Sequence, residues 1–174
     1  MFWIHGGSNI WGTGNSYDFS KLAESQKVVV ITINYRLGPM GWFSSSHLRN
    51  TSEGDDRSSN FGHLDIIAAL EWVQENGNSF GGDPTNVTIF GESAGGHNVL
   101  VMLATKKARG LFHKAISQSG YVSSFSEQFA SEESELSSAK VFQDDIRFLT
   151  EDQQIADYLR AVSYTHLRAH ETLN

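Results

Sequence analysis

Hydrophobic and polar positions follow two different patterns along this chain, one typical of strands and one typical of helices. Residues 2–5 form a short apolar run that ends in a glycine pair, and residues 27–35 form a continuous β-branched run. The second run is typical of a strand that is buried on both faces, as in a parallel sheet. Residues 65–76 predict an amphipathic helix instead, because their apolar side chains recur at spacings of three and four. These helical positions are Ile66, Ala69, Leu70 and Val73.

The same two patterns continue toward the C-terminus. Residues 86–90 and 113–120 predict further strands, residues 94–104 predict a helix, and residues 145–162 return to helical spacing. The stretch 123–140 is rich in Ser and Glu and is typical of a solvated helix or a connector. Strands separated by helices indicate βαβ crossovers. We therefore expect an α/β fold whose sheet is covered by helices on both faces.

Composition narrows the possible partners. The chain has 174 residues, which suffices for one domain with a hydrophobic core. Its formal net charge of −7 and sequence pI near 5.4 argue against nucleic acid as a partner. The absence of cysteine excludes disulfides and thiolate metal sites. No apolar run reaches the roughly 20 residues that span a bilayer, and the first residues lack a signal-peptide pattern. Compartment and oligomeric state stay open.

The sequence FGESAGG, residues 90–96, combines a predicted strand end with a predicted helix start around Ser93. In a G-x-S-x-G nucleophile elbow the serine occupies a sharp strand-to-helix turn, and Gly91 and Gly95 let the strand and helix approach each other closely. The serine hydroxyl then projects at a helix N-terminus, where the helix dipole favours developing negative charge. Because the flanking elements fit this context, we predict that Ser93 is a nucleophile.

A second motif, His-Gly-Gly-Ser at residues 5–8, follows the first predicted strand. Acyl transfer passes through a tetrahedral oxyanion, and each backbone N–H aimed at that oxygen is typically worth about a hundredfold to a thousandfold in rate. A glycine pair can supply such donors because nothing blocks the substrate oxygen. On its own the motif is equally consistent with an ordinary β-turn, but beside the elbow it indicates an oxyanion loop.

Four long segments of the chain occur in a recognisable order and spacing. They are WIHGGSNIWGTG, VVVITINYRLGPMGWF, NFGHLDIIAALEWVQENGNSFGGDPTNVTIFGESAGG and GLFHKAISQSG. Over about residues 1–120 the chain thereby resembles the type-B carboxylesterase family, which includes the cholinesterases. The resemblance implies an α/β-hydrolase fold with a mostly parallel central sheet, incomplete here at both ends. It also implies hydrolysis of small carboxylic esters by a serine nucleophile, without a metal or an organic cofactor.

Carried over by position, the resemblance assigns Ser93 as the nucleophile and the backbone N–H groups of Gly7, Ser8 and Ala94 as the oxyanion hole. The family usually has a third glycine where this chain has Ser8. The N–H donor survives this change, but a side chain then stands near the acyl site. We expect Ser8 to alter the geometry of the hole and to narrow the acyl pocket.

The general base is harder to place. His97 follows Ser93 by one helical turn, but residues on that helix point away from the face where the hydroxyl emerges, and a base needs hydrogen-bond reach. We expect His113 to be a half-buried packing residue and His5 to support the oxyanion loop. His47 and His63 match no catalytic element. In this family the triad acid and histidine come from distant later segments.

Only His166 and His170 satisfy that chain order, and both lie in VSYTHLRAHET, residues 162–172. This peptide resembles a laboratory sequence, since it is identical, residue for residue, to the translation of a common transposase sequencing adapter. Such tails are set aside before function is argued. We therefore interpret residues 1–161 as a partial α/β-hydrolase domain that opens in mid-strand, and residues 162–174 as an adapter-derived tail. Both histidines are excluded from catalysis, and the triad acid and base are expected to lie outside this chain.

Other candidate residues have structural interpretations. Asp65 is expected to be a structural carboxylate near a helix start, and Asp83 a turn residue before Pro84. Ser119 follows a strand as Ser93 does, but the resemblance implies a buried structural serine. A further aromatic group lines either the acyl region or the core. Its members are Trp11, Trp42 and Phe43.

Two functional classes fit the parent protein. The first is a serine esterase that works through an acyl-enzyme on Ser93. The second is a non-catalytic binding or adhesion protein on the same fold, since fold alone does not establish function. Because such relatives commonly lack the nucleophile and this chain retains it, we favour the esterase. The 174-residue chain itself is expected to be inactive and to fold poorly, because it lacks the triad partners and leaves sheet edges exposed. The acyl and alcohol specificity does not follow from the sequence.

Overall fold

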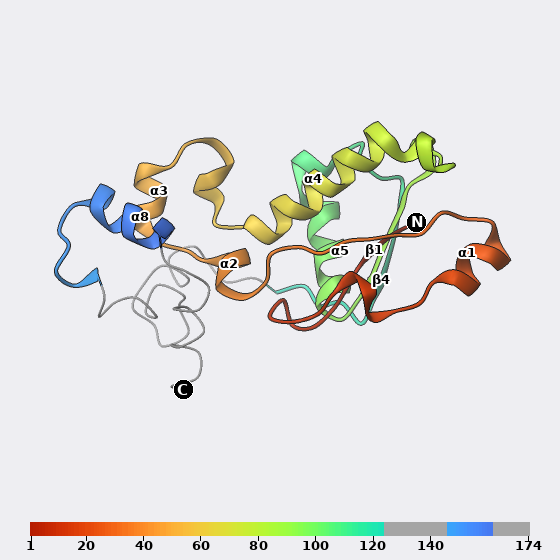
Figure 1. Cartoon of the computed structure of the whole chain (residues 1–174), viewed down its shortest axis with the longest axis horizontal. Coiled ribbons are helices and arrows are strands. Elements are labelled where there is room, and N and C mark those ends of the chain that lie inside the picture. Colours follow the sequence, from red (N-terminus) through yellow and green to blue (C-terminus); the bar gives the residue numbers. More distant parts are fainter. Residues whose placement is uncertain (124–145, 162–174) are drawn as a thin grey trace. The chain divides into compact units, whose positions relative to one another are not determined.

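The computed structural model describes residues 1–123 and 146–161. They fall into two compact units, each described by itself. The first unit comprises Met1–Gly38 and Gly62–Ser123, and the second comprises Pro39–Phe61 and the described part of Ser124–Asn174. Figure 1 labels their helices and strands. No helix of the described ranges is both long and apolar enough to cross a membrane.

The first unit is built on a four-stranded parallel sheet with the order β2-β1-β3-β4. Its strands are β1 (Phe2–Ile4), β2 (Ile31–Thr32), β3 (Thr88–Glu92) and β4 (Lys114–Gln118). Phe2 of β1 lies opposite Ile31 on one side and Ile89 on the other. The predicted α/β class with a parallel sheet is confirmed.

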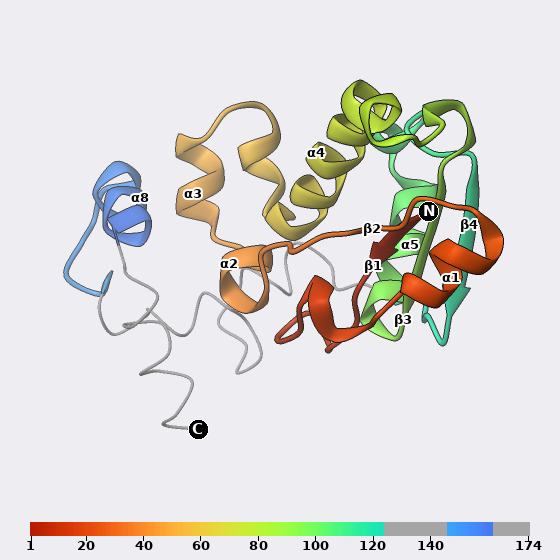
Figure 2. The same cartoon turned by 45° about the vertical axis from the view of Figure 1, so that its right-hand side comes forward.

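Helix α5 (Ala94–Ala104) begins two residues after β3 and packs against β3, β4 and β1 (Figure 2). Its bounds match the predicted helix 94–104. A Cβ added to Gly91 of β3 would lie 2.5 Å from the Gly95 carbonyl of α5, so this face of the sheet touches the helix backbone. Because side chains alternate along a strand, Ile89 and its neighbour Phe2 share that face, and both are fully buried.

Aromatic side chains cover the opposite face of the sheet. Trp3 of β1 and Phe90 of β3 lie opposite each other in register, with ring centroids 4.9 Å apart. Tyr17 and Phe19 pack against Trp3 at 5.3 and 5.2 Å. Phe19 immediately precedes α1 (Ser20–Gln26). The sheet is therefore covered on both faces, as the sequence predicted.

Helix α4 (Phe61–Asn76) contains the predicted amphipathic stretch and starts four residues before it. Its apolar face is buried through Ile66, Ile67, Leu70 and Val73. Near its C-terminal end, the Gln74 Nε2 donates to the carbonyls of Pro84 and Leu111 at 3.0 and 2.9 Å. Short 3-10 helices complete this unit: η1 (Gly14–Ser16), η3 (Gly77–Phe80), η4 (Pro84–Asn86) and η5 (Lys106–Ala108).

The expectations about burial at residues 27–35 and at Ser119 are wrong for the described residues. The β-branched run 27–35 yields only the two-residue strand β2, whose side chains are half-buried rather than enclosed. Ser119, expected to be buried, is exposed. Both errors have one physical cause. β2 and β4 are the two edges of the sheet, so each has a single neighbouring strand among the described residues.

The second unit is helical in its described part. It contains α2 (Gly38–Trp42), α3 (Ser46–Thr51), η2 (Gly54–Ser58) and α8 (Asp152–Ala161). Phe43 packs in an apolar cluster with Leu48, Ile146, Tyr158 and Leu159. The α8 carboxylate of Asp152 accepts hydrogen bonds from His47 Nδ1 at 2.6 Å and Asn50 Nδ2 at 2.8 Å, which joins α8 to α3.

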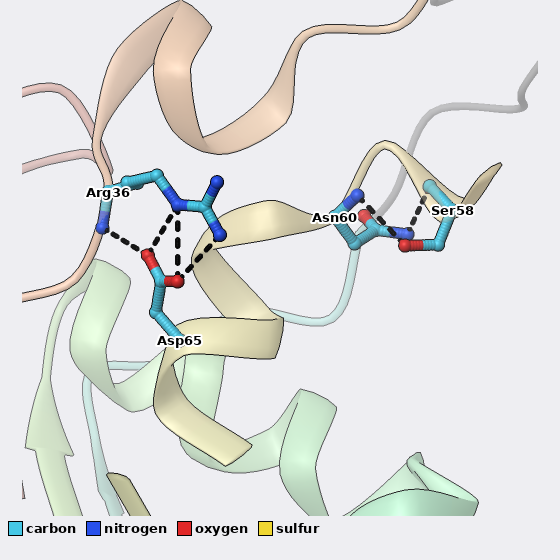
Figure 3. Close-up of polar contacts among 4 residues, drawn as sticks. All are labelled: Arg36, Ser58, Asn60 and Asp65. Atoms are coloured by element: carbon cyan, nitrogen blue, oxygen red, sulfur yellow. Dashed lines mark hydrogen bonds and ion pairs between the residues drawn. The ribbon is translucent and has the colours of Figure 1, made fainter. Parts of the chain in front are cut away.

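The chain between η2 and α4 turns through a local pair of hydrogen bonds. Asn60 donates through its backbone N–H to the Ser58 hydroxyl at 3.3 Å and through Nδ2 to the Ser58 carbonyl at 2.9 Å (Figure 3).

In α8, Ile155 and Ala156 are buried. The predicted helical spacing of residues 145–162 is thus realised mainly as α8. The Ser/Glu-rich stretch 123–140 lies, apart from its first residue, outside the described residues.

Candidate active site

Ser93 occupies a sharp turn between β3 and α5. Its backbone has φ 56° and ψ −122°, a conformation that non-glycine residues rarely adopt and that costs of order 1–3 kcal/mol. Two hydrogen bonds hold it there. The Ser93 N–H donates to the Gln118 carbonyl of β4 at 2.9 Å, and the Ser93 carbonyl accepts from the His97 N–H at 2.9 Å. The neighbouring strand and helix therefore fix the strained serine in place.

The glycines around Ser93 permit this turn by letting backbones touch. A Cβ on Gly95 would overlap the Ile4 carbonyl oxygen and lie 2.8 Å from the His5 carbonyl oxygen. A Cβ on Gly96 would lie 2.6 Å from the Gln118 oxygen. The predicted role of Gly91 and Gly95 in close packing is confirmed. The structure adds that α5 also meets the end of β1, the strand that leads into the glycine-rich loop.

That loop passes directly beside the serine. A Cβ built on Gly6 would lie 3.3 Å from the Ser93 Cβ and 2.7 Å from the Glu92 carbonyl oxygen. The next three residues have positive φ: 103° at Gly7, 56° at Ser8 and 60° at Asn9. Their turn is closed by the Gly7 carbonyl, which accepts from the N–H groups of Ile10 at 2.9 Å and Trp11 at 3.1 Å. The sequence marked Gly6 only as a member of the glycine pair, and it did not predict that Gly6 allows this close approach to Ser93.

Three backbone N–H groups around this turn are not used in hydrogen bonds among the described residues. Across residues 1–123 and 146–161, the N–H groups of Gly7, Ser8 and Ala94 have no hydrogen-bond acceptor. Ala94 is the first residue of α5, where an N–H has no partner within the helix. The loop therefore contributes two unpaired donors and the helix contributes one, on either side of the close contact between Gly6 and Ser93.

His5 is a buried residue that supports the glycine-rich loop through its contacts with Gly6 and Tyr35. Its side chain is 2% exposed, and its Nδ1 lies 2.8 Å from the Gly6 carbonyl oxygen. The imidazole stacks on the Tyr35 ring at 4.4 Å, and the Tyr35 hydroxyl donates to the His5 carbonyl at 2.6 Å. Burial raises the pKa of Tyr35 well above its usual value, so this hydroxyl stays protonated and can donate. These contacts agree with the supporting role expected for His5.

The other described histidines are engaged away from Ser93. His97 Nδ1 lies 2.6 Å from the Tyr121 carbonyl oxygen, and the His97 ring stacks on the Tyr121 ring at 4.3 Å. His63 Nε2 lies 3.1 Å from the Asn98 Oδ1. Burial lowers the pKa of His63, an effect partly offset by Asn98. No histidine in the described part of the chain forms a hydrogen bond with the Ser93 hydroxyl.

His113 departs from the expectation of half-burial. Its side chain is exposed, although Nδ1 accepts from the Val87 N–H at 3.1 Å. The reason is again that this residue precedes β4, an edge strand. His47 belongs to the second unit and is bound to Asp152. His166 and His170 lie outside the described residues.

Asp65 and Asp83 are structural carboxylates, as expected. Asp65 on α4 accepts from the Arg36 backbone N–H at 2.9 Å and from Nε and Nη2 at 2.8 and 2.7 Å (Figure 3). Burial alone would raise the pKa of Asp65, but the bonds from Arg36 outweigh it and hold that pKa below its usual value. Asp83 caps η4 by accepting from the Thr85 N–H at 2.8 Å.

The aromatic candidates divide between surface and core. Trp11 lies in the loop segment of the first unit and is 70% exposed, so it does not pack in the core of this unit. Phe43 packs in the core of the second unit, and Trp42 beside it is half-buried. Among the described residues no group of three His, Cys, Asp or Glu side chains is arranged to hold a metal ion.

Known proteins resemble this chain throughout the region just described. The chain is 53% identical over 122 residues to the para-nitrobenzyl esterase of Bacillus subtilis, an alignment that covers 69% of this chain and 24% of that protein. Carboxylesterase 1E of Rattus norvegicus is 52% identical over 121 residues, covering 69% of this chain and 20% of that protein. The matched segment thus spans a fifth to a quarter of the length of these relatives.

Solved structures agree with the sequence relatives. A thermophilic pNB esterase superposes with a TM-score of 0.79 at 40% identity, covering 99% of this chain and 34% of that one. These structural relatives establish the α/β-hydrolase fold. The model of the carboxylesterase family matches residues 1–173. The chain therefore belongs to the carboxylesterase family.

Proposed function

We propose that the protein containing this chain hydrolyses carboxylic esters through an acyl-enzyme on Ser93. The observation that carries this proposal is the strained turn at Ser93, with φ 56°, beside a loop whose N–H groups are open. A strained residue persists only where its surroundings enforce it, and such residues cluster at functional sites. Membership of the carboxylesterase family and relatives named as esterases support the same chemistry.

In the proposed reaction the Ser93 hydroxyl attacks the ester carbonyl carbon while a histidine takes its proton. The carbonyl oxygen becomes an oxyanion that accepts from the N–H groups of Gly7, Ser8 and Ala94. Collapse of the tetrahedral intermediate expels the alcohol, which receives the proton from the histidine. Water then attacks the carbonyl carbon of the acyl-enzyme while the histidine takes a proton from it. The second tetrahedral intermediate collapses, the acid is released, and the Ser93 oxygen regains a proton from the histidine. The N-terminus of α5 adds a partial positive charge next to the oxyanion.

The histidine and the acid that orients it are proposed to come from outside this chain. The described histidines are held by other partners, and His166 and His170 fall in the sequence that matches an adapter. For this reason the 174-residue chain alone is expected not to turn over esters. The complete gene product is the proper subject for an activity measurement.

The substrate is proposed to be a small carboxylic ester with a modest acyl group. The para-nitrobenzyl esterase among the relatives is named for an ester of a small alcohol, and its name specifies no acyl group. Ser8 places a hydroxymethyl group on the loop that carries two of the proposed oxyanion donors. That side chain is expected to limit the size of the acyl group.

The test uses the complete gene product and 4-nitrophenyl acetate. Ser93→Ala is expected to lower kcat by at least about 10⁴-fold, since removal of a nucleophile leaves only binding and the oxyanion hole. Ser119→Ala is the matched control, because Ser119 also follows a strand and has positive φ, 52°. It is expected to retain activity near that of the unmodified protein. An active Ser93→Ala variant, or an unmodified protein without esterase activity, would contradict the proposal.

We also propose that, within this chain, the sequence encoded by the native gene stops near Ala161 and that the residues after it derive from the adapter. Residues 162–172 match the adapter translation, whereas the family model extends its match to residue 173. A longer read of the source DNA through the codon for Ala161 shows whether residues 162–172 come from the native gene or from the adapter. The proposal expects the adapter codons to be missing from the genomic sequence. Unbroken genomic sequence into the codons of VSYTHLRAHET would overturn it.

A further inference from the structure

Asn98 is a fully buried amide next to the nucleophile. It lies on α5, four residues after Ala94, and is 0% exposed. A buried amide without hydrogen bonds destabilises the fold, so its partners decide whether Asn98 stabilises or destabilises it. The reaction proposed above assigns it no role. Its contacts, however, lead to the loop that carries Gly7 and Ser8.

The Asn98 amide joins three segments of the chain. Its Nδ2 donates to the Asn9 Oδ1 at 2.9 Å, across 89 residues of sequence. Its Oδ1 lies 3.1 Å from the His63 Nε2 on α4, which requires that this ring nitrogen carry the proton. The Asn98 side chain also acts on Tyr35, because burial raises the pKa of that hydroxyl and Asn98 lowers it by a smaller amount. The bonds to Asn9 and His63 engage the nitrogen and the oxygen of the amide, and together they fix its orientation.

These partners grip the oxyanion loop at both of its ends. Asn9 is bound directly through its side chain. At the other end, the Tyr35 hydroxyl that Asn98 contacts donates to the His5 carbonyl at 2.6 Å. Between these two anchors lie only three residues, Gly6, Gly7 and Ser8. Asn98 thus sits at the centre of a clamp, which we define as Asn98, Asn9, Tyr35 and the His5 carbonyl.

The loop needs such a restraint because its backbone is strained. Ser8 and Asn9 both have φ near 60°, a region that is unfavourable for an L-residue. Asn tolerates this region better than most residues, which suits it to this position. The Asn9 carbonyl also accepts from the Gly38 N–H at 2.6 Å. Without anchors, the segment would relax toward negative φ and its N–H groups would turn.

We propose that Asn98 is a positioning residue that fixes the oxyanion loop to the helix that begins directly after the nucleophile. This inference rests on the proposed esterase function. Two of the three oxyanion donors come from the loop and the third, Ala94, comes from α5 itself. The donors serve one oxygen only if loop and helix keep a constant separation. Asn98 provides that constraint, because it belongs to α5 and binds the loop residue that follows Ser8.

The expected kinetic signature is a fall in kcat without a matching rise in KM. Oxyanion contacts strengthen as charge develops, so losing them affects the transition state more than the bound ester. Loss of one donor typically costs about 10²–10³-fold in kcat. A more mobile loop keeps the N–H groups of Gly7 and Ser8 but holds them less well oriented toward the oxyanion. We expect Asn98→Leu, of similar volume and without polar atoms, to lower kcat about 10- to 100-fold with KM changed by less than about threefold.

Two substitutions at Asn9 separate the hydrogen bond from backbone strain. Asn9→Gly keeps a residue that accepts positive φ but removes the Oδ1 acceptor, so it should resemble Asn98→Leu. Asn9→Asp keeps an acceptor for the Asn98 Nδ2 and should retain kcat within about threefold. Gln74→Leu is the matched control. It removes another partly buried amide, one that donates to the Pro84 and Leu111 carbonyls far along α4 from the clamp.

The experiment measures kcat and KM for 4-nitrophenyl acetate and backbone hydrogen exchange in the complete gene product. The proposal expects faster exchange in peptides covering residues 5–12 of Asn98→Leu, with peptides from β3 and α4 unchanged. It expects Gln74→Leu to lower the melting temperature without lowering kcat. Equal acceleration of exchange in all peptides, an unchanged kcat, or a rise in KM alone would overturn it.

The exchange measurement keeps this inference separate from the esterase proposal. If the unmodified protein hydrolyses no ester, the proposed function fails while local exchange in residues 5–12 still reports on the clamp. If the unmodified protein is active but Asn98→Leu and Asn9→Gly match it in kcat and in exchange, the clamp fails and the esterase stands.

Discussion

The contact between Gly95 and the end of β1 makes a sharp prediction about stability. In a helix, Gly→Ala ordinarily stabilises by about 1 kcal/mol, because alanine has the highest helix propensity. At Gly95 the added Cβ would overlap the Ile4 carbonyl oxygen and lie 2.8 Å from the His5 carbonyl oxygen. Both are backbone atoms of a packed sheet and cannot rotate away. Overpacking of this kind costs typically 1–3 kcal/mol and occasionally more.

Because rigid backbone places Gly95→Ala at or above the top of that range, we expect a net loss of about 2 kcal/mol after the propensity gain. The assay is urea unfolding of the complete gene product, where the midpoint should fall with an unchanged slope. Gly77→Ala is the control, since its Cβ would meet the Pro84 Cγ at an ordinary 3.4 Å. It should stay within about 0.5 kcal/mol of the parent. If Gly95→Ala proved as stable as the parent, α5 would not meet β1 as described.

Three further predictions concern single side chains. Asp65→Asn removes the charge of a carboxylate that accepts from three nitrogens of Arg36, and it should cost about 1 kcal/mol in urea unfolding, a modest value because the pair is partly exposed. Burial lowers the pKa of His63, so the folded state binds this proton less readily than the unfolded state and stability should fall as pH drops below about 6.5. His63→Gln, which can still donate to Asn98, should flatten the melting temperature between pH 7 and pH 5, whereas an unchanged pH dependence would assign the effect to other groups. Ser8→Gly should raise kcat/KM for esters with bulky acyl groups by about tenfold relative to the acetate ester, because it removes a side chain from the proposed acyl pocket. The measurement uses 4-nitrophenyl esters of increasing acyl chain length. An unchanged ratio would show that Ser8 does not line the acyl pocket.

Local pattern was enough to predict the sharp strand-to-helix turn at Ser93. The run of β-type residues before Gly91 and the apolar helix after Ser93 lie next to each other in sequence, so their junction needs no long-range information. The predicted helix 94–104 matches α5 at both ends. Strands β1, β3 and β4 fall within about two residues of their expected places because β-branched and aromatic residues mark them.

Burial at the sheet edges could not be predicted in the same way. A β-branched run such as 27–35 indicates a strand but not its position in the sheet. In the described residues it forms an edge, so its side chains are half-buried. The exposure of Ser119 follows from the same strand order. These features depend on which strands flank β2 and β4, and that information is not local.

The clamp around Asn98 was also beyond sequence reasoning. Asn9 and Asn98 are separated by 89 residues and meet only because β1 lies beside β3 in register, with Ile4 opposite Gly91. A lone Asn on a helix carries no pattern that would single it out. The close approach of Gly6 to Ser93 was not predicted for a similar reason, since it depends on the same register.

Covalent labelling of Ser93 tests the central claim most directly. The complete gene product is treated with a fluorophosphonate probe, which phosphonylates an activated serine, and the modified residue is located by peptide mass spectrometry. If Ser93 is the nucleophile, we expect one adduct, on Ser93, formed in step with loss of esterase activity and absent from Ser93→Ala. An adduct on Ser119 or another residue, or full activity after complete modification of Ser93, would contradict it.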